Sequence, residues 1–189
     1  MFLSTFVMMN QVVASRFKRL QDDHRLFMAE LDREKQEVLE TSPAPGKWSV
    51  TQVMYHLNKA ESLSVLYVSK KRLGVAQLKP TRIEAQVRLL VAWIGFNIPI
   101  KYPAAKVLGD MPPVVKYDEI KPQWLKTRES LASLLESLSD DEIRKPIFKQ
   151  PFFGRWNIFQ MLSFMQIHFS RHKKQMLRAM EMVKKKQEL

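Results

Sequence analysis

Apolar residues recur at helical spacing along most of the chain, and no segment shows sustained alternation of apolar and polar positions. Between residues 11 and 39 they form one stripe, made of Val13, Phe17, Leu20, Phe27 and Leu31. This stripe predicts a first long helix over about 11–39. The helix should end before "TSPAPGK", because the prolines of that segment cannot continue it.

Two later segments begin with the same helix-capping pattern. In "KWSVTQVM", Ser49 is placed to be the N-cap residue and Gln52 the third helical residue, which together form a capping box. In "RWNIFQML", Asn157 and Gln160 stand in the same two positions. An apolar pair spans each helix start and adds a hydrophobic staple, Trp48 with Val53 and Trp156 with Met161. Both helix starts are therefore predicted from side-chain chemistry as well as from periodicity.

The remaining pattern predicts a short helix over about 81–96, an irregular loop "NIPIKYPAAKVLGDMPP" and a further long helix over about 117–138. Four long helices with one short insertion indicate an all-α four-helix bundle. The extra short helix and loop lie between the second and third long helices, in a crossover insertion at 74–117. We expect one domain over 1–189, with 1–10 as a disordered extension.

Composition narrows the chemistry that such a bundle can host. The chain contains no cysteine, which excludes disulfides, zinc–thiolate sites and cysteine nucleophiles. Its net charge of +12 is spread along every segment and forms no basic stripe interleaved with aromatic residues. We therefore expect a solvated basic surface and no nucleic-acid partner, and a site for an anionic small molecule would also fit. Neither a signal peptide nor a membrane span is expected, since the longest apolar run after the N-terminal segment has about 12 residues where a span needs about 20. A cytoplasmic protein is the expectation.

Three of the four histidines have the spacing of metal ligands. His168 and His172 are four residues apart on the last helix, the spacing at which two imidazoles of one helix face can bind one ion. His56 lies seven residues after Ser49, about 10 Å into its own helix. If these two helices are antiparallel, all three imidazoles reach one level of the bundle. Spacing alone leaves two interpretations open, a metal site and hydrogen-bonded histidines in the core.

The segments "PGKWSVTQVMYHLNKAE" and "LSDDEIRKPIFKQPFFGRWNIFQMLSFMQIHFSRHKKQM" resemble the DinB-like family, four-helix metalloproteins related to bacillithiol transferases. The resemblance covers roughly residues 15–180. It implies an up-down-down-up bundle and a divalent metal ion held by His56, His168 and His172, with zinc or nickel favoured and iron or copper also open. The strong positive charge departs from most of the family.

The implied function is transfer of a low-molecular-weight, bacillithiol-like thiol to an electrophile. The alternatives are a metal-dependent hydrolase and a non-catalytic metal-binding stress-response protein. Arg171 and Lys59 flank ligand positions, and we predict that they contact an anionic substrate; solvated surface charge is the alternative for both.

Four more polar residues lie near these positions. Gln175 is expected to orient a ligand imidazole, whereas Gln52 is expected to serve mainly as the capping residue. Glu61 points away from the ligand cluster and should pair with a buried Arg, Lys or Trp N–H, and His24 is expected to be a core residue, with a fourth ligand as the alternative.

The helix over 81–96 is too apolar to stand free in water. We expect it to pack across the open end of the bundle, with the following loop forming a wall of the metal cavity. A homodimer interface is the alternative.

Overall fold

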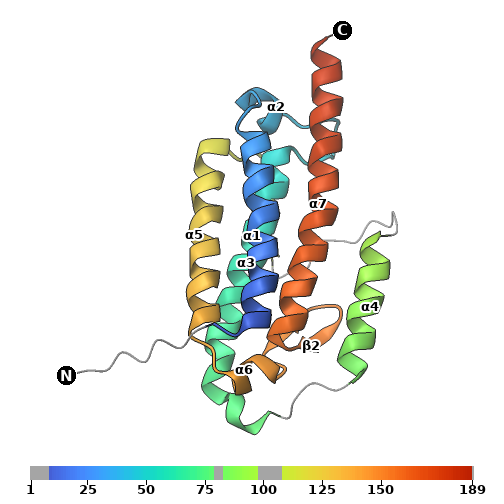
Figure 1. Cartoon of the computed structure of the whole chain (residues 1–189). Coiled ribbons are helices and arrows are strands. Elements are labelled where there is room, and N and C mark those ends of the chain that lie inside the picture. Colours follow the sequence, from blue (N-terminus) through green and yellow to red (C-terminus); the bar gives the residue numbers. More distant parts are fainter. Residues whose placement is uncertain (1–8, 79–82, 98–107, 189) are drawn as a thin grey trace, which may run out of the picture.

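A computed structural model describes residues 9–78, 83–97 and 108–188. The chain is mostly helical, with 74% of residues in helices and a two-stranded sheet as its β structure in these ranges. The four long helices are α1 (Gln11–Leu31), α3 (Val50–Lys71), α5 (Tyr117–Glu136) and α7 (Ile158–Gln187). Figure 1 shows α1 and α7 running in one direction and α3 and α5 in the other. The predicted all-α, up-down-down-up bundle is confirmed.

Both predicted capping boxes are present. The Ser49 hydroxyl accepts a hydrogen bond from the backbone N–H of Gln52, and the Gln52 side chain accepts one from the Ser49 N–H. Asn157 and Gln160 make the same exchange at the start of α7. These two helices carry all three candidate ligands, so the caps fix where each ligand helix begins.

The first long helix is shorter than its predicted span of 11–39. It ends at Leu31, and a turn leads to the short α2 (Gln36–Glu40). Residues 32–37 are all polar, so no apolar side chain holds those turns against the core. The carboxylate of Asp32 instead accepts hydrogen bonds from two residues of α5, the Tyr117 hydroxyl and the Lys121 ammonium, each within 2.8 Å. The rest of the stripe is correct, since its five predicted members are buried.

The crossover insertion carries α4 (Ile83–Asn97), close to the predicted 81–96. Before it, the irregular helix η1 (Arg72–Gln77) continues α3. The prediction that α4 crosses the open end of the bundle is wrong. It lies beside the N-terminal half of α7 and next to the hairpin (Figure 1). Two small residues at a seven-residue spacing, Ala85 and Ala92, are buried and allow this close approach. Much of the predicted loop, 98–107, lies outside the described residues.

A β-hairpin that periodicity did not predict connects the short helix α6 (Asp140–Arg144) to α7. Its strands are β1 (Phe148–Gln150) and β2 (Gly154–Trp156). Three-residue strands are too short for a detectable alternation of apolar and polar residues. Gly154 has φ of +82°, a backbone conformation that side chains other than glycine rarely adopt. The hairpin places aromatic side chains at the N-terminal end of α7, beside α4.

The N-terminal segment 1–8 lies outside the described residues, so its predicted disorder stays a prediction. The next residues are part of the bundle. Met9 packs against the core, and Asn10 caps α1 while its side-chain amide donates to Asp140 at 2.7 Å. Within the described ranges, no helix has both the length and the apolar character needed to cross a membrane.

Candidate metal centre

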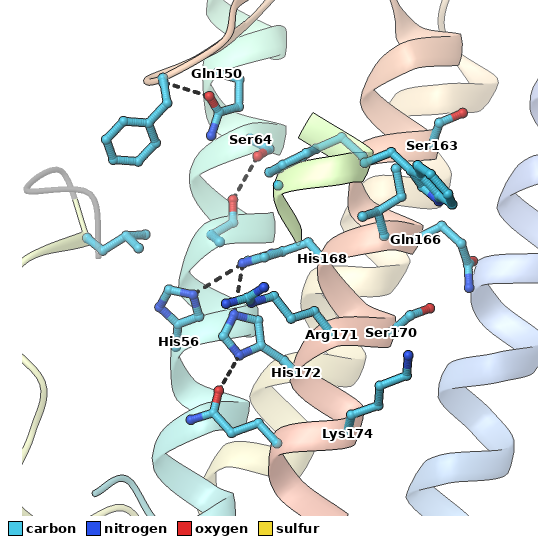
Figure 2. A pocket seen from close by; sticks show the side chains of 18 of the residues that line it. His56, Ser64, Gln150, Ser163, Gln166, His168, Ser170, Arg171, His172 and Lys174 are labelled. Carbon is cyan, nitrogen blue, oxygen red and sulfur yellow. Dashed lines mark hydrogen bonds between the residues drawn. The ribbon is translucent and has the colours of Figure 1, made fainter. Parts of the chain in front are cut away.

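The three predicted histidines converge between the antiparallel helices α3 and α7 (Figure 2). The Nε2 atom of His168 lies 3.3 Å from Nε2 of His56 and 3.1 Å from Nε2 of His172. One ligand nitrogen from each residue lies within 4.8 Å of the other two. Nitrogens bound at about 2.0–2.1 Å to one tetrahedral zinc ion would be about 3.4 Å apart. The cluster is therefore compatible with a metal site.

Burial keeps these imidazoles neutral. It lowers the pKa of His56 to about 4 and the pKa of His172 to about 3, and it lowers the pKa of His168 well below the ordinary histidine value. The positive charge of Arg171 acts in the same direction on the pKa of His168 and His172. Neutral imidazole is the form that offers a nitrogen lone pair to a metal ion.

Gln175 is hydrogen-bonded to one candidate ligand, which is the contact that its predicted orienting role requires. Its side-chain oxygen lies 2.9 Å from Nδ1 of His172, and an amide oxygen can only accept a hydrogen bond. The proton of the His172 ring therefore sits on Nδ1, and the lone pair of Nε2 points toward His168. Such partners orient ligand rings and raise their basicity.

Replacing Gln175 by leucine should lower the affinity for zinc about 10- to 100-fold, the range typical of losing the hydrogen-bond partner of a metal ligand. A competition titration against a chromophoric chelator measures this affinity. Gln175→Glu is the matched control, because a carboxylate also accepts the proton of Nδ1 and should keep most of the affinity. Equal zinc affinity of the leucine variant and the parent protein would show that Gln175 does not act through His172.

Aromatic rings hold the other two ligands in place. The Phe164 ring stacks on His168, with centroids 5.5 Å apart and an interplanar angle of 11°. Trp48 contacts His56 at a centroid distance of 5.4 Å. Sequence reasoning did not assign either aromatic residue to the site. The position of Phe164 one turn before His168 is a signal that could have identified it.

The two predicted substrate contacts lie in different cavities. Arg171 lines the large cavity that opens beside the histidines, and Figure 2 shows it next to His172. Lys59 lines a smaller neighbouring cavity, which His56 and Trp48 share and which the segment 108–111 closes. Within the described part of the predicted loop, residues 108–111 thus line a cavity together with His56.

The remaining polar residues have structural partners. Gln52 completes its capping box and also donates to the Pro112 carbonyl at 2.8 Å, so it holds the end of the insertion. His24 is buried against Trp124 and lies outside the ligand cluster, as expected of a core residue, but its Nε2 atom has no hydrogen-bond partner among the described residues, so the expected hydrogen bond is not seen there. Glu61 pairs with Arg128 and with the Trp124 N–H, which confirms the predicted kind of partner.

Comparison with known protein families matches residues 16–176 to the DinB superfamily. The matched range includes all three histidines and most of the bundle. Comparison with curated proteins and comparison with solved structures each gave no significant match.

Proposed function

Since the chain belongs to the DinB superfamily, we propose that it holds a divalent metal ion on His56, His168 and His172 and transfers a low-molecular-weight thiol to an electrophile. The observation that carries the proposal is the convergence of three neutral imidazole nitrogens beside a large open cavity. Zinc and nickel suit a site of three imidazoles, and iron and copper also accept such ligands. Supply in the cell decides among these ions.

A divalent ion bound to three neutral ligands keeps its full positive charge, so it lowers the pKa of a coordinated thiol or water toward neutrality. The protein's own part is to bind and orient the thiol. Arg171 lies within one turn of both ligands of α7 and is placed to hold a carboxylate of an anionic thiol. Lys59 would reach such a group only from the neighbouring cavity.

The transfer forms a bond between the thiol sulfur and the electrophilic carbon. The leaving group departs with the electron pair of its former bond to carbon, and the thiol proton passes to solvent. The aromatic and aliphatic side chains of the cavity lining provide an apolar surface for the electrophile.

The test is conjugation of 1-chloro-2,4-dinitrobenzene by protein loaded with zinc or nickel, with cysteine, coenzyme A and bacillithiol as thiol donors. We expect a rate above the uncatalysed reaction with at least one thiol, and its loss in the His168→Ala variant. Hydrolysis of p-nitrophenyl acetate that depends on the metal, without conjugation, would replace the proposal by the hydrolase alternative. Stoichiometric metal without either activity would favour the non-catalytic metal-binding stress-response protein.

A homodimer interface, the alternative that the sequence left open for the apolar helix, stays a proposal. It is supported by two apolar side chains of α4, Val87 and Leu90, which are each more than half exposed and do not belong to the lining of the large cavity. The molar mass of the protein in solution, measured by light scattering, tests it.

A further inference from the structure

The cavity beside the histidines is much larger than a small thiol requires. Its volume is about 2240 Å³, whereas pockets for small ligands span about 300–1,000 Å³. It is bounded by α3, α4, α7 and the hairpin, with further lining from α1 and from the loop before α3. The apolar and charged side chains of this lining indicate which kind of second substrate the cavity can bind.

One end of the cavity is apolar and begins at the ligand cluster itself. On α3, Leu63 and Tyr67 follow His56 by seven and eleven residues, so they lie on the same line of the helix. On α7, the stacked ring of Phe164 continues that surface from His168. The opposite wall consists of side chains from α4 and from the hairpin, namely Val91, Trp93, Ile94, Phe152 and Phe153.

The other end of the cavity is cationic. Arg171 and Arg178 are seven residues apart on α7, which places them on one side of the helix and about 10 Å apart along it. Lys47 lines the cavity at the same end, ahead of α3. Of the other α7 residues in the lining, Lys174 and Ser170 point away from the histidines in Figure 2. Arginine and lysine side chains gathered along one wall provide the recognition of a carboxylate, sulfonate or phosphate.

The balance of charge around the whole cavity supports an anionic ligand. Among the described residues, seven Lys or Arg side chains line it, including Lys174 on the side away from the histidines, against one carboxylate, that of Asp23. That carboxylate already accepts a hydrogen bond from the Gln166 side chain at 2.5 Å. The described lining therefore carries an excess of positive charge, which favours an anionic ligand over a cationic or zwitterionic one.

We infer that the electrophilic substrate is an elongated amphiphilic anion. Its acidic end lies over Arg178 and Lys47, which leaves Arg171 to the carboxylate of the thiol. Its apolar part extends between α3 and α4, and its reactive carbon lies between the two ends at the histidine cluster. The assignment of the reactive carbon rests on the proposed function, whereas the binding mode rests on the cavity alone. Long-chain and polycyclic aromatic acids both have this chemistry.

The test uses 11-(dansylamino)undecanoate, a fluorescent amphiphilic anion, with the full-length, zinc-loaded protein and with the metal-free protein. Its fluorescence should rise on binding to both forms, and unlabelled carboxylates should compete about three- to fourfold better per added methylene while their chains stay inside the cavity. Arg178→Gln should weaken binding about tenfold or more, through the lost charge-assisted contact. Trp93→Ala and Ile94→Ser should each weaken it several-fold.

Matched controls lie on surfaces outside the cavity. Arg25→Gln removes an exposed arginine from α1, and Leu125→Ala removes an exposed apolar side chain from α5; neither should change binding. Equal binding of the methyl ester of the probe, or binding that none of the cavity variants changes, would overturn the inference. Probe binding without thiol conjugation would refute only the proposed transfer, and conjugation without probe binding would refute only the amphiphilic substrate.

Discussion

Replacing His168 by alanine should abolish stoichiometric binding of zinc or nickel. His168 is the central member of the candidate ligand cluster, since its Nε2 is 3.3 Å from Nε2 of His56 and 3.1 Å from Nε2 of His172. Its removal leaves two donors, and the loss in affinity should exceed the roughly 10- to 100-fold cost of losing only the partner of a ligand. Metal analysis after gel filtration measures the stoichiometry. The helical circular dichroism signal should stay close to that of the parent, because α7 keeps its capping box and its buried face.

Thermal unfolding gives a second measure of the same prediction. A ligand that binds only the folded state at 100 times its Kd stabilises that state by about 2.7 kcal/mol. For a chain of this size, such a gain raises the Tm by roughly 5–10 °C. Added zinc should produce this rise in the parent protein and not in the alanine variant.

His24 supplies the matched control, since it is the one histidine of the sequence outside the cluster. Its ring packs edge-on against Trp124, so a phenyl ring preserves most of that contact. His24→Phe should retain one equivalent of metal and the zinc-dependent rise in Tm. Full metal content in His168→Ala, or loss of metal in His24→Phe, would contradict the assignment of the ligands.

Local side-chain chemistry explains why the ligand helices could be predicted from the sequence. The capping boxes at Ser49 and Asn157 act within four residues, so they can be read directly from the order of residues. They fix the depth of His56 and of the pair on α7. The sequence order does not show that these two helices are antiparallel neighbours. That prediction rested on the family resemblance and on the requirement that His56 and the histidine pair of α7 lie at the same level of the bundle.

The features that sequence reasoning missed depend on contacts between distant segments. The end of α1 at Leu31 has a local side that the sequence does show, the six polar residues 32–37, and a distant side that it does not, the hydrogen bonds of Asp32 with Tyr117 and Lys121, more than 80 residues away. The position of α4 depends on the fit of Ala85 and Ala92, which helical periodicity treats like any other apolar residues. Helical periodicity identifies which side of a helix is buried, but only the tertiary structure shows which element packs against that side.

A buried ion pair between α3 and α5 holds the helix that carries His56. The side chains of Glu61 and Arg128 are 4% and 2% exposed, and Nε of Arg128 lies 2.8 Å from Oε2 of Glu61. Nη2 of Arg128 donates to the other carboxylate oxygen at 2.9 Å, and the Trp124 N–H donates to Oε2 at 2.9 Å. Burial raises the pKa of the Glu61 carboxyl, while the charge of Arg128 acts against this rise.

Breaking this pair should be among the most destabilising single changes in the protein. Arg128→Leu leaves the Glu61 carboxylate buried without its charged partner, which typically costs about 3–5 kcal/mol. At about 2–4 °C per kcal/mol, the Tm should fall by roughly 6–20 °C. Thermal unfolding of the metal-free protein measures the change without a contribution from metal binding.

The double variant Glu61→Leu with Arg128→Leu separates the two possible origins of such a loss. An apolar pair of similar volume often restores the stability lost on breaking a buried ion pair, so the double variant should unfold at a higher temperature than Arg128→Leu. The exposed pair of Lys18 and Asp22 on α1 is the matched control, and Asp22→Asn should leave the Tm almost unchanged. If Arg128→Leu unfolds at the same temperature as the parent, the pair does not hold α3 against α5. If the double variant is as unstable as Arg128→Leu, lost packing around Trp124 is the cause rather than an unpaired charge.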